Sequence, residues 1–183
     1  MLAGLLRLRA ASPSSALCCY QGNHDKSPDN ALPPQFSGAL SIPEALGLAD
    51  LGIKWIDRKA QPHRIGKLLL AHGDNLFFEG RPPMHHARGA TERAIAPRDT
   101  LVYGHTHPPQ NFIRGHRFGN MTAIGLGCGR DLYAAYNTDR VTGWENEFGV
   151  AYVRPSGECD VYPIRVRNGA CAFAGSLYVG RRA

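Results

Sequence analysis

The sequence predicts a loop-rich α/β (α+β) protein that folds as one globular domain over residues 1–183. Two observations predict this class. Short apolar runs are separated by Gly and Pro along the whole chain, with 21 Gly and 13 Pro, which disfavours a helical bundle. Strand, loop and helix patterns alternate up to about residue 96, and strand patterns dominate after it. A chain of 183 residues, 43% of them hydrophobic, can form one core, and disorder is excluded as its main state.

The first half of the chain is expected to alternate strands and helices. Leu2, Leu5, Leu6 and Leu8 are spaced as on an amphipathic helix. Pro43 sits where the first turn of another helix would be, and Pro97 would end a third helix. We expect strands over 16–20, 53–56, 67–71 and 100–103, helices over 42–51 and 84–96, and a loop over 29–41.

The second half is expected to consist mostly of strands. The side chains over 160–166 alternate as on a half-buried antiparallel strand. Gly, Asn and Pro separate this run from the other β-type runs, over 112–113, 118–124, 148–153 and 170–173.

Charge and cysteine usage limit the class of protein. The 21 basic and 15 acidic residues give a net charge of +6, which permits anionic substrates or nucleic acid. The basic residues are scattered, so no basic arm is predicted. Five cysteines without a CxxC pair argue against a disulfide framework and a zinc ribbon, and favour a reducing, cytoplasmic compartment. No apolar run approaches 18 residues, so we expect no membrane association.

Three predicted strands each end in a polar cluster. The clusters are Gly22-Asn23-His24-Asp25, His72-Gly73-Asp74 and Gly104-His105-Thr106-His107. Each of the first two alone is also typical of a turn. Because ligands gather at the carboxyl ends of strands in α/β sheets, we expect the three clusters to converge. Imidazole, amide and carboxylate groups are ligands for Mn, Fe, Zn or Ni, so the clusters predict a metal site.

The motifs GNHD, HGD and GHTH, in this order and each at a strand end, resemble the C-terminal half of the calcineurin-like metallophosphoesterase superfamily. The later segments NMTAIG, GC and WENEFG are similar to the phage and prophage-type phosphoesterases. The resemblance covers about residues 17–178. It implies a metallophosphoesterase-like β-sandwich flanked by helices, with two divalent metal ions at the strand ends.

The resemblance also implies roles for individual residues. Asn23, His72 and His105 would ligate one metal and His107 the other. His24 would protonate the leaving alkoxide or contact the phosphoryl group, with Asp25 orienting it. The expected activity is hydrolysis of a phosphate mono- or diester by a metal-activated water, and the substrate is a phosphorylated small molecule or a nucleic acid.

The first two motifs of that family, Asp-x-His and Gly-Asp-x-x-Asp, do not occur before GNHD here. The 21 residues that precede Gly22 contain no Asp, Glu or His. We therefore expect an N-terminally truncated fold, either a fragment or a short form, with exposed sheet edges that favour oligomers. The missing motifs leave the number of metals open, two as in the family or one, and they would impair activation of water by two metals. Two alternatives stay open: a catalytically silent remnant that binds nucleic acid or a protein partner through its Arg-rich surface, and a mononuclear metal-binding protein.

Several other residues have no single predicted role. His85 and His86 are expected on a surface helix, solvated or near the substrate, and Asp74 is expected to support His72. Trp144 is predicted at the edge of the core. Nothing in the sequence selects among the three arginines that could reach a phosphate, which are Arg81, Arg88 and Arg130.

Overall fold

The computed structural model describes residues 2–25, 31–36, 41–57, 61–74, 76, 83–132 and 142–180, with Leu2 and Pro83 described by their backbone alone. These residues form a mixed α/β structure with several small sheets, which confirms the predicted class. No helix among them is long and apolar enough to cross a membrane. The chain divides into two compact units, Met1–Ala60 and Gln61–Ala183, which we describe in turn.

The first unit contains a two-stranded parallel sheet. Its elements are α1 (Leu2–Ala11), β1 (Leu17–Tyr20), the 3-10 turn η1 (Pro34–Phe36), α3 (Ile42–Ala45) and β2 (Ile53–Ile56). β1 pairs with β2 in register, from Leu17 opposite Ile53 to Tyr20 opposite Ile56. The pairing confirms both predicted strands.

The two helices of this unit differ from their predictions. The helix α1 is present, but Leu6 and Leu8 are each about half exposed, so its leucines do not form one buried face. Arg9 on α1 instead donates hydrogen bonds to the carbonyl oxygens of Leu51 and Gly52, at 2.8 and 3.0 Å. The helix predicted over 42–51 ends at Ala45, because the chain reverses at Gly47, whose φ of 59° is left-handed.

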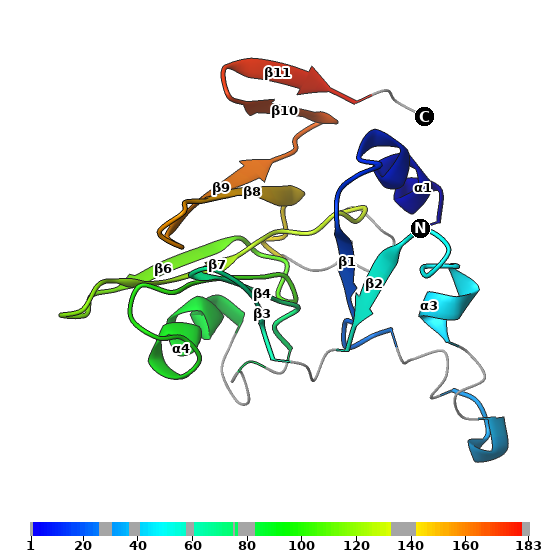
Figure 1. Cartoon of the computed structure of the whole chain (residues 1–183), viewed down its shortest axis with the longest axis horizontal. Coiled ribbons are helices and arrows are strands. Elements are labelled where there is room, and N and C mark those ends of the chain that lie inside the picture. Colours follow the sequence, from blue (N-terminus) through cyan, green and yellow to red (C-terminus); the bar gives the residue numbers. More distant parts are fainter. Residues whose placement is uncertain are drawn as a thin grey trace. The chain divides into compact units, whose positions relative to one another are not determined.

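The second unit is built on a five-stranded mixed sheet (Figure 1). In spatial order its strands are β3 (His63–Ile65), β4 (Leu68–Ala71), β5 (Thr100–Tyr103), β7 (Met121–Gly125) and β6 (Gln110–Arg114). β4, β5 and β7 run parallel, while the edge strands β3 and β6 run antiparallel to their neighbours. Three parallel strands in the centre therefore end at the same edge of the sheet.

The two faces of this sheet are covered by different layers. The 3-10 turn η2 (Pro83–His85) leads into α4 (His86–Arg93), whose alanines pack on one face against Leu69, Leu101 and Tyr103. The hairpin of β8 (Glu147–Val153) and β9 (Cys159–Arg165) packs on the other face. That face presents Leu68, Val102 and Ile124, the alternate side chains of the same three strands. The central strands are thus buried on both sides.

Several boundaries in this unit differ from the predictions. The helix expected over 84–96 ends at Arg93, and β7 begins at Met121 rather than at residue 118. Two further strands were not predicted, β3 and the strand β11 (Ser176–Val179), which pairs with β10 (Ala170–Phe173). β3 is short and mostly polar, so it has no apolar pattern to identify it. β11 contains the apolar residues Leu177, Tyr178 and Val179, but the structure leaves all of its residues exposed.

Candidate functional site

His72 and His105 lie side by side at the carboxyl ends of β4 and β5. The two strands pair with Ala71 opposite Tyr103, and the backbone N–H of Gly104 donates to the carbonyl oxygen of His72 at 3.0 Å. The pairing therefore continues beyond both strands. It brings the two imidazole ring centroids to 5.2 Å, with the ring planes 68° apart.

The loop that carries His105 and His107 has a strained backbone. His105 has a φ of 37° and His107 a φ of 68°, a region that residues with a Cβ rarely adopt. Such a conformation persists only where the surrounding structure holds it, and it is concentrated at functional sites. The strain supports a functional role for these two histidines.

A hydrogen-bonded chain from Tyr103 fixes this loop. The Tyr103 hydroxyl donates to Oε1 of Gln110 at 3.2 Å, and Nε2 of Gln110 donates to Oγ1 of Thr106, between the two histidines, also at 3.2 Å. The backbone N–H of Ala87 donates to the same Gln110 Oε1 at 3.1 Å, which adds the start of α4 to the network. Burial raises the pKa of Tyr103, so its hydroxyl stays protonated and can donate.

The Tyr103 ring itself is fixed by two glycines. A Cβ at Gly125 would lie 2.8 Å from Cζ and Oη of Tyr103, and a Cβ at Gly73 would lie 3.0 Å from its ring. Only glycine leaves room for the ring at both positions. The glycine in each of the strand-end segments HGD and NMTAIG therefore helps to position the network that supports His105 and His107.

The surroundings of His105 keep its imidazole neutral. Burial and, to a smaller extent, the nearby His72, His86 and His107 lower the pKa of His105 to about 4, against the opposing effect of Asp74. Its Nδ1 is buried and forms no hydrogen bond within the described residues. A neutral imidazole with an available nitrogen is the form that binds a metal ion.

His86 is part of this group, so of its two predicted environments, solvated or near the substrate, the solvated one is wrong. Its side chain is only 5% exposed, because α4 packs on the sheet through neighbouring residues such as Ala87 and starts at the site. His85 is exposed, as expected. We call His72, His86, His105 and His107 the histidine cluster.

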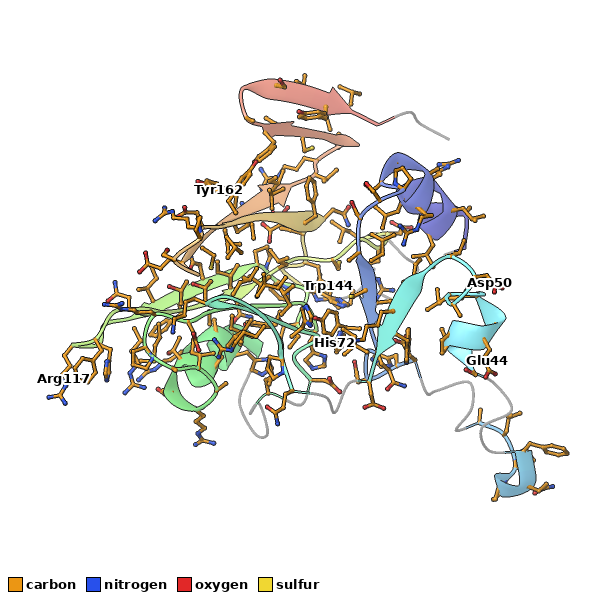
Figure 2. All side chains as sticks on the ribbon, in the orientation of Figure 1. Glu44, Asp50, His72, Arg117, Trp144 and Tyr162 are labelled. Carbon is orange, nitrogen blue, oxygen red and sulfur yellow. The ribbon has the colours of Figure 1, made fainter. Side chains whose placement is uncertain are left out.

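Trp144 and Arg130 extend the site beyond His107. The His107 and Trp144 rings lie 4.7 Å apart at 76°, and Cζ of Arg130 lies 5.0 Å from the centroid of the Trp144 ring (Trp144 and His72 are labelled in Figure 2). Nδ2 of Asn146 holds the arrangement by donating to the carbonyl oxygens of Cys128 and Arg130, at 3.0 and 2.7 Å.

Neither Trp144 nor Arg130 was selected from the sequence. Trp144 was predicted only at the edge of the core, and Arg130 was one of three arginines without a distinguishing feature. A usable signal was that β7 is a third parallel strand, so the residues after it reach the same edge as His72 and His105. Of the other two arginines, Arg88 is exposed and pairs with Glu92, while Arg81 lies outside the described residues.

The GNHD cluster belongs to the first unit and follows β1. Oδ2 of Asp25 accepts a hydrogen bond from the backbone N–H of Gly22 at 2.6 Å, which closes the turn that contains Asn23 and His24. His24 is exposed. The cluster thus lies at the carboxyl end of a parallel strand, as predicted. Its approach to His72 stays a prediction.

The histidine cluster fits a divalent metal ion in the kind of its donors. Within the described residues, however, no group of three or more His, Cys, Asp or Glu side chains is arranged closely enough to hold one. The expectation of a bound Mn, Fe, Zn or Ni ion therefore stays a prediction.

Comparison of the chain with models of protein families gives no match, and comparison with curated proteins gives none either. The assignment of the site therefore depends on the chemistry and geometry of its own residues.

Proposed function

We propose that the histidine cluster binds a divalent metal ion and hydrolyses a phosphate mono- or diester. The observation that carries the proposal is the contact between His72 and His105, 33 positions apart in sequence, at the ends of two paired parallel strands. Two adjacent imidazoles at the carboxyl edge of a sheet have no packing role that an apolar residue would not fill better. Metal binding accounts for both of them.

The charge of the site favours a phosphate ester as the substrate. The Arg130 guanidinium lies over Trp144, which in turn contacts His107, so a fixed cation lies next to the cluster. Arg binds phosphate through paired N–H donors, and stacking on an aromatic ring limits the side-chain entropy that it loses on binding. We assign Arg130 to binding the phosphoryl group and Trp144 to positioning both Arg130 and His107.

The layers of the second unit support the finer fold prediction, a metallophosphoesterase-like sandwich. A helix covers one face of a mixed sheet and a β-hairpin covers the other, with the histidines at the sheet edge. On this proposal Asn23 supplies a further metal ligand, and His24 protonates the leaving oxygen with Asp25 orienting it. A divalent metal, when bound, polarises the phosphate and provides a nucleophile at neutral pH.

Metal binding by the purified chain tests the first part of the proposal. After treatment with a chelator, the chain is dialysed against Mn²⁺ or Zn²⁺ and its metal content is measured by elemental analysis. We expect about one ion per chain, and affinity reduced about 100-fold or more in His72→Ala and His105→Ala. His63→Ala, which removes a histidine on β3 instead, is the matched control and should bind as the wild type does. Equal metal binding by the wild type and all three variants would overturn the proposed metal site.

Hydrolysis of an aryl phosphate and a bis-aryl phosphodiester in Mn²⁺ tests the second part. We expect turnover that needs both His72 and His105, and a loss of about 10- to 100-fold in kcat/KM for Arg130→Ala, with Arg88→Ala as the exposed control. Arg130→Lys should recover only part of the loss, because Lys cannot form the paired contact. A chain that binds metal and turns over neither ester would favour the silent remnant over the enzyme.

A further inference from the structure

The turn between β6 and β7 forms a basic projection at the other end of the sheet. Gln110 pairs with Gly125 next to the histidine cluster, whereas Arg114 pairs with Met121 at the far end of the same two strands. Residues 113–119, which we call the β6–β7 tip, therefore lie at the opposite end from the proposed metal site. Figure 2 labels Arg117 at this tip.

The tip carries uncompensated positive charge. Arg114, His116 and Arg117 are exposed, and Arg98 bonds to the tip through its Nε, which donates to the carbonyl oxygen of Phe118 at 2.9 Å. The chain has no Asp or Glu over residues 100–130. Nearby Asp99 is buried and forms its ion pair with Arg64 at 2.9 Å. No carboxylate in the described part of the chain pairs with Arg98, Arg114 or Arg117, so these charges are available to an anion.

The backbone of the tip is ordered by its own hydrogen bonds. The N–H of Phe118 donates to Nδ1 of His116 at 3.2 Å, and the N–H of Gly119 donates to the His116 carbonyl oxygen at 3.0 Å. Gly119 has a φ of 117°, and a Cβ there would collide with Cγ of Arg98. A preformed turn loses less conformational entropy on binding than a mobile one.

Planar groups are stacked on this turn. The Phe118 side chain is 57% exposed, although burial of an aromatic ring is favourable. Cζ of Arg117 lies 4.4 Å from the centroid of the Phe118 ring, and the His116 ring centroid lies 5.5 Å from it. Exposed aromatic rings among cations are the combination that binds single strands, since bases stack on the ring while the cations contact phosphates.

We propose that the β6–β7 tip binds single-stranded nucleic acid, with Phe118 stacking on a base and Arg114 and Arg117 contacting the backbone. Charge complementarity selects a polyanion, and the stacked planar groups select nucleobases over lipid acyl chains. The inference does not depend on the proposed hydrolysis, because the tip lies away from the histidine cluster and its binding needs no metal.

Fluorescence anisotropy with a labelled oligothymidylate of about 16 nucleotides, a length that one small domain can cover, tests the inference in the presence of a chelator. We expect binding that weakens as salt is raised. The double variant R114A/R117A should bind about 10-fold more weakly, with the slope of log K against log[salt] reduced by about 1.4, since each phosphate contact contributes about 0.7. Phe118→Ala should weaken binding about 5-fold or more without changing that slope.

The matched control is R7A/R154A, which removes two exposed arginines elsewhere and leaves the tip intact. It should bind within about twofold of the wild type, because binding depends on local contacts and not on net charge alone. Equal losses in the two double variants would overturn the inference. So would tighter binding to the same sequence as a duplex, or binding to vesicles of anionic phospholipid without binding to the oligonucleotide. Thermal unfolding of each variant shows whether a loss of binding reflects a loss of fold.

Discussion

The β6–β7 tip and the loop that follows β5 both contain left-handed backbone, but different residues adopt it. At the β6–β7 tip, the left-handed position is occupied by Gly119, which adopts it without steric cost. At the other end, His105 and His107 take left-handed conformations that glycine would adopt more easily. Histidine at these positions lowers the stability of the fold through its strained backbone, but it provides an imidazole side chain. The comparison indicates that the imidazoles, rather than the turn, are what this loop provides.

The support given to the two ends differs accordingly. The strained loop is held by the fully buried Tyr103 together with two half-buried groups, the side chain of Gln110 and the hydroxyl of Thr106. The tip is held by exposed backbone hydrogen bonds and by one arginine side chain, that of Arg98. The first end should therefore be sensitive to changes in the core and the second only to changes in the turn itself.

The largest effect is expected from Tyr103→Ala, which removes the central buried ring of the strained end. We expect the free energy of unfolding to fall by about 3–5 kcal/mol, as for other large aromatic truncations in a core. Tyr103→Phe keeps the ring and removes only the hydroxyl, so it should lose about 1 kcal/mol. Denaturant unfolding measures both. A loss below about 1 kcal/mol in the alanine variant would mean that this ring does not support the loop.

A smaller effect is expected from Gly119→Ala at the tip. The added methyl group requires a left-handed backbone and displaces Arg98, so we expect a loss of about 1–3 kcal/mol in the same measurement. Gly115→Ala is the matched control in the same turn, where a Cβ would meet no atom within 4 Å, and it should change stability by less than about 0.5 kcal/mol. Similar losses in the two variants would contradict the role assigned to Gly119.

The smallest effect is expected at His107, where two substitutions test directly whether the backbone is strained. His107→Gly and His107→Ala both remove the imidazole and its contact with Trp144, but only glycine adopts a φ of 68° without strain. In the presence of a chelator, the glycine variant should be more stable than the alanine variant by about 1 kcal/mol. Equal stabilities, or a more stable alanine variant, would show that the backbone at this position is unstrained and that the comparison between the two ends fails.

The predictions from sequence succeeded where one local pattern decided the outcome. The apolar runs over 67–71 and 100–103 became β4 and β5, because a run bounded by Gly or Pro and too short for a helix is typical of a buried strand. The prediction for 42–51 was wrong because the left-handed conformation of Gly47 overrode the helical spacing. The prediction that the leucines of α1 form one buried face was wrong, because Arg9 rather than these leucines contacts the turn before β2.

For the site, the sequence identified His72, His105 and His107 as candidate metal ligands at the ends of strands. It did not identify the burial of His86, nor the stack formed by His107, Trp144 and Arg130. Each of these depends on which distant segment packs where. The loop after β7 and the segment before β8 meet through hydrogen bonds from the Asn146 side chain and between the backbones of Cys128 and Glu145, and no spacing in the chain encodes that contact.

By itself, then, the sequence determined the strands that are apolar runs bounded by turn residues, the polar residues that follow them and the glycines that allow close approach, since these depend on local propensity and periodicity. Only the tertiary structure decided the strand order β3-β4-β5-β7-β6, which sets β4 beside β5 and makes neighbours of two histidines 33 positions apart. It also decided that, in the part of the chain that the structure describes, no carboxylate pairs with the arginines at the tip. The physical reason is that strand pairing, register and packing depend on contacts between residues far apart in the sequence. The free energy of the whole core therefore determines them.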